Sequence, residues 1–175
     1  MPHFLRVASV LAAFGASLAA APAADTSTLL GVSKDWSAYQ ATTGGGKTCY
    51  ALAKPKSVLP KKAARDPIYV LISDWPDRKV TGELEVVPGY SYKDGEPVMA
   101  EVGDVKIEFF TRNDGGSGTA WVKDPADEAK LLDAMRTGSS LVVSGVSARG
   151  THTKDSYSLS GLSSILDKVH AACAK

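Results

Sequence analysis

The chain has only two cysteines, and their positions constrain the fold more than any other feature. Cys49 lies in the first third of the chain, and Cys173 is followed by only two residues. A disulfide between them would link positions 124 apart (173 − 49). On the chain-entropy model, closing a loop of that size stabilises the folded state by roughly 4–5 kcal/mol. Such a link would hold an early segment against the last one, provided that the protein folds in an oxidising compartment.

The N-terminus indicates such a compartment. A weakly basic start leads into Val7–Ala20, an apolar and alanine-rich run, and Ala21–Ala23 reads Ala-Pro-Ala, which fits a cleavage site. The run is shorter than the ~20 apolar residues that a membrane-spanning helix needs. We therefore predict a cleaved signal peptide, with no integral membrane segment left after cleavage.

The predicted organisation is a signal peptide over residues 1–23 and a single domain over residues 24–175. The mature protein is expected in the periplasm, with the cell surface or secretion as alternatives. Because that environment is oxidising, we predict a disulfide between Cys49 and Cys173. Two free buried thiols are the alternative.

The mature segment reads mainly as short β-strands. Thr48–Ala53, Ile68–Ile72 and Leu141–Val146 are alternating or β-branched runs, bounded by Gly, Pro and Asp. Strands and helices do not alternate regularly, as a doubly wound parallel sheet would require. The prediction is a mainly β fold: an antiparallel β-sandwich or barrel with one internal short helix and a C-terminal helix.

Two details of this prediction concern the ends of strands. The segment Ala24–Ser33 is small and polar and is expected to fray. Asp94-Gly95 is a strong hairpin signal, and it predicts that Tyr90–Tyr92 pairs with Val98–Val102.

Both helices have recognisable signals. Asp124 fits the N-cap position and Pro125 the first helical position of the internal helix, which Gly138 ends. In the C-terminal helix an apolar stripe recurs at helical spacing. Its members are Leu162, Ile165, Leu166, Val169 and Cys173. The cysteine is therefore expected to face the core.

Charge narrows the range of partners. The chain has 20 Lys and Arg against 19 Asp and Glu. That balance argues against a nucleic-acid or anionic-membrane partner, which usually needs a basic face. One local basic cluster is interpreted as a solvated loop. It consists of Lys54, Lys56, Lys61, Lys62 and Arg65.

No segment forms a convincing catalytic or cofactor site. Ala41–Thr48 fits a loose form of the phosphate-binding loop, but a strand-like run follows it where a helix would be required. It is interpreted as a turn. The scattered acids and the Asn113–Gly116 turn lack the spacing of a calcium loop, so no metal or cofactor is predicted.

Four residues remain as candidate partner contacts. They are Trp75, Arg149, His152 and Asp155. Trp75 follows a strand in an Asp- and Pro-containing turn, where an aromatic side chain can be exposed. His152 and Asp155 also support an alternative, a small-molecule hydrolase whose site would be assembled around them. That hypothesis requires His152 within hydrogen-bond reach of a nucleophile or metal.

The stretch Ser147–Leu162 reads SARGTHTKDSYSLSGL. It resembles the invasion-associated locus B (IalB) family, whose members often carry S-x-R-G-T-x-T-x-D-x-Y-S-L-x-G-F before an apolar helix ending in cysteine. Leu162 stands where Phe is common, at a packing position. The Trp-containing first strand, Cys49 and the Ala120-Trp121 pair are also similar, so the resemblance covers most of the mature chain.

The resemblance implies an exported envelope protein of a Gram-negative cell, and some family members are linked to entry into host cells. It supplies no catalytic residues. The predicted function is that of a non-enzymatic envelope protein of the invasion-associated type, which binds or supports another envelope or host component.

Overall fold

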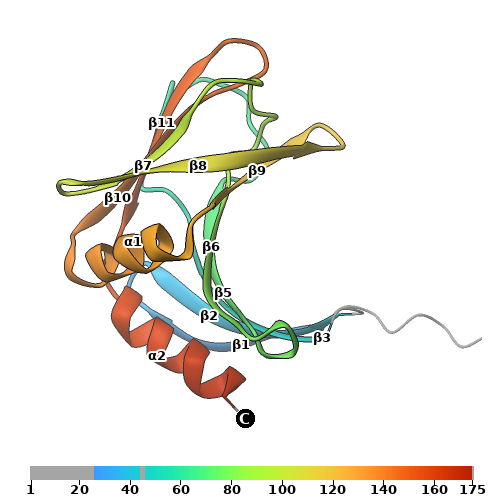
Figure 1. Ribbon diagram of the computed structural model, residues 1–175, viewed down its shortest axis with the longest axis vertical. Helices are drawn as coiled ribbons and strands as arrows, with labels where there is room; N and C mark the ends of the chain where they lie inside the picture. The colour runs from blue at the N-terminus through green and yellow to red at the C-terminus, as the bar shows by residue number, and fades with distance from the viewer. Residues whose placement is uncertain (1–25, 44–45, 175) are drawn as a thin grey trace, which may run out of the picture.

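The computed structural model describes residues 26–43 and 46–174, and the predicted signal peptide lies outside these residues. The described residues form an 11-stranded antiparallel sheet with two α-helices. The predicted mainly β, antiparallel fold with one internal and one C-terminal helix is confirmed. Figure 1 shows that the sheet curls strongly, so that its two halves face one another across a common interior.

In the first half of the sheet the strands follow the order of the sequence, except that one intervening strand pairs elsewhere. In sheet order they are β1 (Thr26–Ser33), β2 (Trp36–Thr43), β3 (Gly46–Ala53), β5 (Tyr69–Trp75) and β6 (Val80–Val87). A 3-10 turn, Pro76–Arg78, joins the last two.

The second half is ordered differently from the sequence. In sheet order it consists of β9 (Ser117–Val122), β8 (Val105–Asp114), β7 (Val98–Val102), β10 (Ser140–Val146), β11 (His152–Ser158) and β4 (Ser57–Leu59). The edge strand β4 comes from early in the chain but pairs with β11. The chain therefore crosses from one half of the sheet to the other and back.

Contacts between the two halves fix the curl. The indole Nε1 of Trp36 donates a hydrogen bond to the backbone oxygen of Ser158 at 2.9 Å, and the side chain of Trp36 is fully buried. The backbone amide of Asp35 donates to the oxygen of Ser160 at 3.3 Å. These bonds join the start of β2 to the end of β11.

The helices have the predicted signals. In α1 (Pro125–Thr137) the Asp124 carboxylate accepts the Ala126 amide at 2.8 Å, which satisfies a donor at the helix start. Leu131 and Met135 of this helix are buried in the core. In α2 (Leu162–Cys173) the whole predicted stripe is buried, and the helix packs against β1, β2, β3 and β5.

The predicted disulfide between Cys49 and Cys173 is present and confirmed. It joins β3 to the last residue of α2, with the two Cα atoms 5.8 Å apart. Polar contacts surround it. His170 Nδ1 lies 2.6 Å from Asp74 Oδ2, and Lys47 Nζ donates to the oxygen of Ala172 at 2.6 Å.

Two predictions about strands were wrong. Thr26–Ser33 does not fray, because it pairs along its length with β2. Tyr90–Tyr92 does not form a hairpin with β7, which instead pairs with β8 and β10, whereas Tyr92 makes a single bridge to Ser147. Pairing with a distant segment outweighs the local turn signal of Asp94-Gly95. As a result, Tyr90 and Tyr92 lie beside β10 and β11.

Candidate functional site

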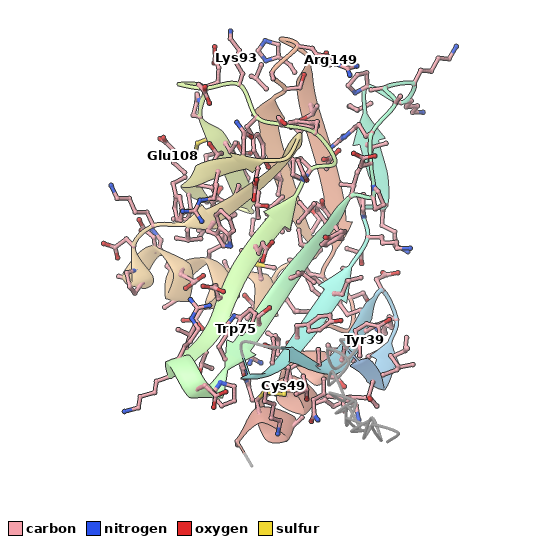
Figure 2. All side chains as sticks on the ribbon, turned by 90° about the vertical axis from the view of Figure 1, so that its right-hand side faces the viewer. Tyr39, Cys49, Trp75, Lys93, Glu108 and Arg149 are labelled. Atoms are coloured by element: carbon pink, nitrogen blue, oxygen red, sulfur yellow. A yellow bond between two sulfur atoms is a disulfide. The ribbon has the colours of Figure 1, made fainter. Side chains whose placement is uncertain are left out.

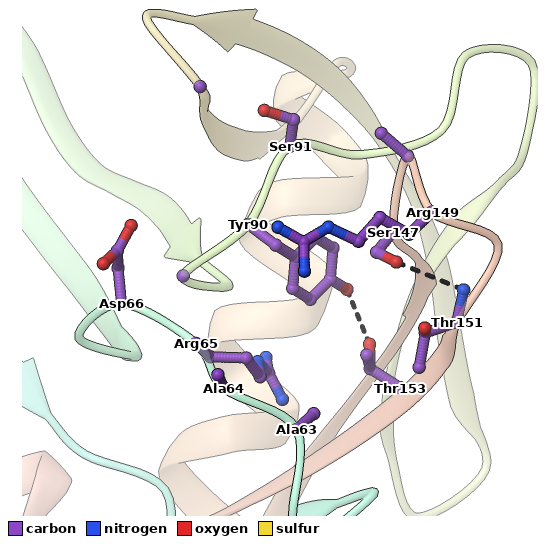
Figure 3. Close-up of a pocket in the computed structure, with 13 residues that line it drawn as sticks. Ala63, Ala64, Arg65, Asp66, Tyr90, Ser91, Ser147, Arg149, Thr151 and Thr153 are labelled. Carbon is purple, nitrogen blue, oxygen red and sulfur yellow. Dashed lines mark hydrogen bonds between the residues drawn. The ribbon is translucent and has the colours of Figure 1, made fainter.

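A pocket of about 550 Å³ opens at the end of the curled sheet away from α2. Four connections and the start of β11 surround it: the segment before β5, the segment after β6, the β8–β9 turn and the β10–β11 turn. Figure 2 shows Arg149 near this end of the molecule and Cys49 near the other. Figure 3 shows the pocket and the side chains that line it.

A buried ion pair underlies the pocket. Arg65 Nη1 and Nη2 donate to the two carboxylate oxygens of Asp155 at 2.7 and 2.5 Å, and both side chains are only 4% exposed. Arg65 Nε also donates to the oxygen of Pro88 at 2.8 Å. Burial opposes the charge on Arg65, but the bonds and charge of Asp155 outweigh it, so the pKa of Arg65 lies above its ordinary value.

Tyr90 packs against this ion pair. The ring centroid of Tyr90 lies 4.9 Å from the Arg65 guanidinium carbon, and the Tyr90 hydroxyl lies 2.6 Å from Thr153 Oγ1. Thr153 Oγ1 in turn donates to the oxygen of Gly145 at 3.2 Å, so the Tyr90 hydroxyl is the donor in the first bond. Tyr92 packs edge-on against Tyr90.

Two of the tyrosine hydroxyls are unusual. Those of Tyr92 and Tyr157 are buried and have no hydrogen-bond partner among the described residues. Burial raises the pKa of both phenols well above the ordinary value. The region beneath the pocket is therefore polar but only partly satisfied, which is uncommon in a protein interior.

The β10–β11 turn forms one rim of the pocket and is tightly held. The amide of Gly150 donates to the oxygen of Ser147 at 2.7 Å, and the amide of Thr151 donates to Ser147 Oγ at 3.1 Å. Gly150 has a φ of +81°, a conformation that glycine adopts readily. The amide of Ala148 donates to the oxygen of Ser91 at 2.7 Å, which ties this rim to the segment after β6.

Arg149 projects from this rigid turn. It is exposed, and in the described part of the chain no carboxylate lies within ion-pair distance of it. Figure 3 shows its side chain extending from the turn across the pocket. Asp66, which lines the pocket from the segment before β5, is not paired with it.

The structure separates the predicted candidate residues. His152 and Asp155 lie three positions apart on β11, so they point to opposite faces of the sheet. His152 is exposed, whereas Asp155 is 3% exposed and bound to Arg65. The structure therefore does not assemble the hydrolase site proposed around them, and the Asp155 carboxylate is occupied within the protein.

Trp75 lies at the opposite end of the sheet from the pocket. It is half-buried, its Nε1 donates to Glu83 Oε2 at 2.8 Å, and the guanidinium of Arg78 lies 5.2 Å from its ring centroid. A shared contact surface for Trp75 and Arg149 is therefore not present on this chain.

Two further interpretations can be compared with the structure. Thr48 lies inside strand β3 of the β2–β3 hairpin, so Ala41–Thr48 does not open a helix and is not a phosphate-binding loop. Arg65 was assigned to a solvated basic loop, and this was wrong. Lysines and alanines precede it and Asp66 follows it, but its partner Asp155 is 90 positions away, so no local signal marked the pairing.

The sequence and fold of the chain can be compared with known proteins. The family model described as "Invasion associated locus B (IalB) protein" matches residues 36–170. This chain belongs to the IalB family. The predicted family is confirmed, and the match includes the turn that carries Arg149.

A solved structure supports the same fold. The crystal structure of invasion associated protein b from Bartonella henselae is similar to this chain, with a TM-score of 0.56 and 16% sequence identity. The similarity covers 85% of this chain and 99% of that one. A search of curated proteins found no match.

Among the described residues no helix is long and apolar enough to cross a membrane. Over the same residues, no group of three or more His, Cys, Asp or Glu side chains is arranged to hold a metal ion.

Proposed function

We propose that this IalB-family chain is an exported, non-enzymatic envelope protein that binds another envelope or host component through the pocket at the β10–β11 turn. One observation carries the proposal. The stretch that resembles the family motif forms one wall of the pocket. Ser147, Arg149, Thr151 and Thr153 line it, and Asp155 holds Arg65 beneath it.

The β10–β11 turn is rigid before any ligand binds. The turn is held by its own hydrogen bonds and by the bond from Ala148 to Ser91, so its position does not depend on a ligand. A site that is formed before binding loses little conformational entropy on binding. The ion pair beneath the pocket supports this rim from within the sheet.

The proposal has two parts that need separate tests. Export is tested by fractionating cells that naturally express the full chain. We expect the protein in the periplasmic or surface fraction, shortened by about 23 residues as the signal-peptide cleavage motif predicts. Recovery of the full-length protein in the cytoplasm would contradict the export part.

Binding through the pocket is tested by placing a photo-crosslinking amino acid at Ala148, on the rim, in the full chain in its native cells. Position Lys106 on β8, which is exposed and not part of the pocket lining, is the matched control. We expect an adduct from Ala148 that Lys106 does not give. Identical adducts, or none from Ala148, would contradict the proposal that the pocket is the binding site.

A further inference from the structure

We infer that the pocket binds an anionic group, a carboxylate or a phosphate, with Arg149 as its principal contact. This inference rests on the proposed binding function and names the chemistry of the ligand. It follows from which groups on the pocket wall are free and which are already occupied.

The pocket contains two arginines, and only one of them has N–H donors that are free to bind a ligand. Arg65 already has donors bound to Asp155 and to the oxygen of Pro88, and its charge is neutralised. Arg149 has no such partner in the described chain, so its full charge and its planar set of N–H donors remain available.

Hydroxyl groups line the pocket together with Arg149. Ser91 and Thr151 line the pocket, and neither side chain makes a hydrogen bond within the described residues. Ser147 Oγ accepts the Thr151 amide, which leaves its O–H proton free to donate. Three hydroxyls with unused donors therefore line the same cavity as an unpaired guanidinium.

The free donors and the unpaired charge indicate which type of ligand the pocket binds. A wall of unused donors with one unpaired positive charge is complementary to an acceptor group that carries negative charge. Guanidinium groups bind carboxylate and phosphate through paired N–H···O bonds, which are stronger than bonds between neutral groups. The one carboxylate among the lining residues, that of Asp66, is exposed and not paired with Arg149.

The remaining wall indicates the size of the ligand. It includes Ala63 and Ala64, which carry only a methyl group, and Gly89 and Gly116, which carry no side chain, so the cavity stays open. A cavity of about 550 Å³ is within the usual range for small-molecule sites. The anionic group is therefore expected on a compact unit such as one sugar or one short side chain.

The test uses three probes of similar size with the mature protein: glucose, glucuronate and glucose 6-phosphate. Binding is followed through the backbone amide NMR signals of Gly89, Gly150 and Thr151. We expect both charged probes to shift these signals and neutral glucose to leave them unchanged. Added salt should weaken the binding, because the contact is exposed and charged.

Matched variants assign the effect to one residue. Arg149→Gln should weaken binding of the charged probes at least 10-fold, and Arg149→Lys should have a smaller effect because it keeps the charge. Arg78→Gln removes an arginine that packs on Trp75, which lies at the other end of the sheet (Figure 2), and should leave affinity unchanged. Because Arg149 and Arg78 are exposed, neither variant should alter the fold.

Three results would overturn the inference: equal binding of glucose, unshifted pocket signals with both anions, or an unchanged affinity in Arg149→Gln. If the two anions differ, the tighter one identifies the preferred group. Adducts from Ala148 without anion binding would leave the proposed binding function in place and remove only the anionic ligand. Anion binding without a specific Ala148 adduct would keep the anion site and remove the proposal that the protein binds its partner through this pocket.

Discussion

The two ends of the curled sheet are closed by different chemistry. At the α2 end, an apolar helix face and the Cys49–Cys173 disulfide seal the interior. At the pocket end, the Arg65–Asp155 ion pair and three tyrosines occupy the interior, and a cavity remains above them. Apolar packing and a covalent bond leave little space for a ligand, whereas fixed polar groups can frame one. We infer that the α2 end stabilises the fold and that the pocket end provides a binding site.

The largest expected effect comes from breaking the buried ion pair. Asp155→Ala leaves the Arg65 charge without its partner in a position that is only 4% exposed. Removal of one partner from such a pair typically costs 3–5 kcal/mol, and we expect about 4 kcal/mol here. Urea unfolding of the variant and the wild type measures the difference.

A surface pair serves as the control for that prediction. Glu101→Ala removes the partner of Lys106, whose side chain is 60% exposed, so the change should stay below about 1 kcal/mol. The double change Arg65→Met with Asp155→Leu should recover much of the loss, because no charge is then left buried. If Asp155→Ala were as mild as Glu101→Ala, the polar end would not depend on this ion pair.

The disulfide should have the next largest effect. Replacing both Cys49 and Cys173 with alanine is expected to destabilise the fold by about 3 kcal/mol, which is typical of disulfides and below the chain-entropy value, because measured effects often fall short of that model. Reduction of the wild type should give a similar loss in urea unfolding, and the double variant should not respond to reductant. The pocket end should keep its structure in the variant, so unchanged amide signals of Gly150 and Thr151 are expected. Loss of those signals would show that the two ends are not independent.

The smallest predicted effects concern the buried tyrosine hydroxyls. Tyr157→Phe removes a hydroxyl that has no partner among the described residues, so it should be neutral or stabilise the fold by about 1 kcal/mol at pH 7. Tyr90→Phe is the matched control. It removes the bond to Thr153 and should destabilise by about 1 kcal/mol.

These tyrosines also predict an alkaline dependence. Because burial raises the pKa of Tyr92 and Tyr157 in the folded state, the neutral phenols are favoured by folding. Their contribution is complete below about pH 10, where the unfolded phenols are also protonated. It is lost as the pH rises from there toward the higher folded-state pKa. Tyr157→Phe should reduce this loss in unfolding measured between pH 9 and 11, and an unchanged profile would contradict the assignment to Tyr157.

The sequence predicted the apolar end better than the polar end. Helical spacing placed Cys173 on the same stripe as Ile165 and Val169, and that stripe is buried as expected. Along β11, the alternation of the strand accounts for the burial of Thr153, Asp155 and Tyr157 on one face. Both are local patterns, and local periodicity survives in the fold.

The polar end depended on contacts that are distant in sequence. The Arg65–Asp155 pair joins residues 90 positions apart, and β4 pairs with β11 across nearly the same distance. The Asp94-Gly95 turn misled the prediction for Tyr90 and Tyr92, because a long-range bridge to Ser147 replaced the hairpin. An inward-facing Asp155 was the one available signal that a buried cation must lie opposite, since a lone buried carboxylate is costly.

The link between Cys49 and Cys173 also sets an order of assembly. Synthesis proceeds from the N-terminus, so Cys49 cannot form this bond until Cys173 has been synthesised. The edge strand β4 also remains unpaired until late in synthesis, because its partner β11 lies close to the C-terminus. The early strands can pair among themselves, but the final closure at both ends belongs to the last quarter of the chain. A product that ends before Cys173 would therefore lack the disulfide, and one that ends before β11 would also lack the partner of β4.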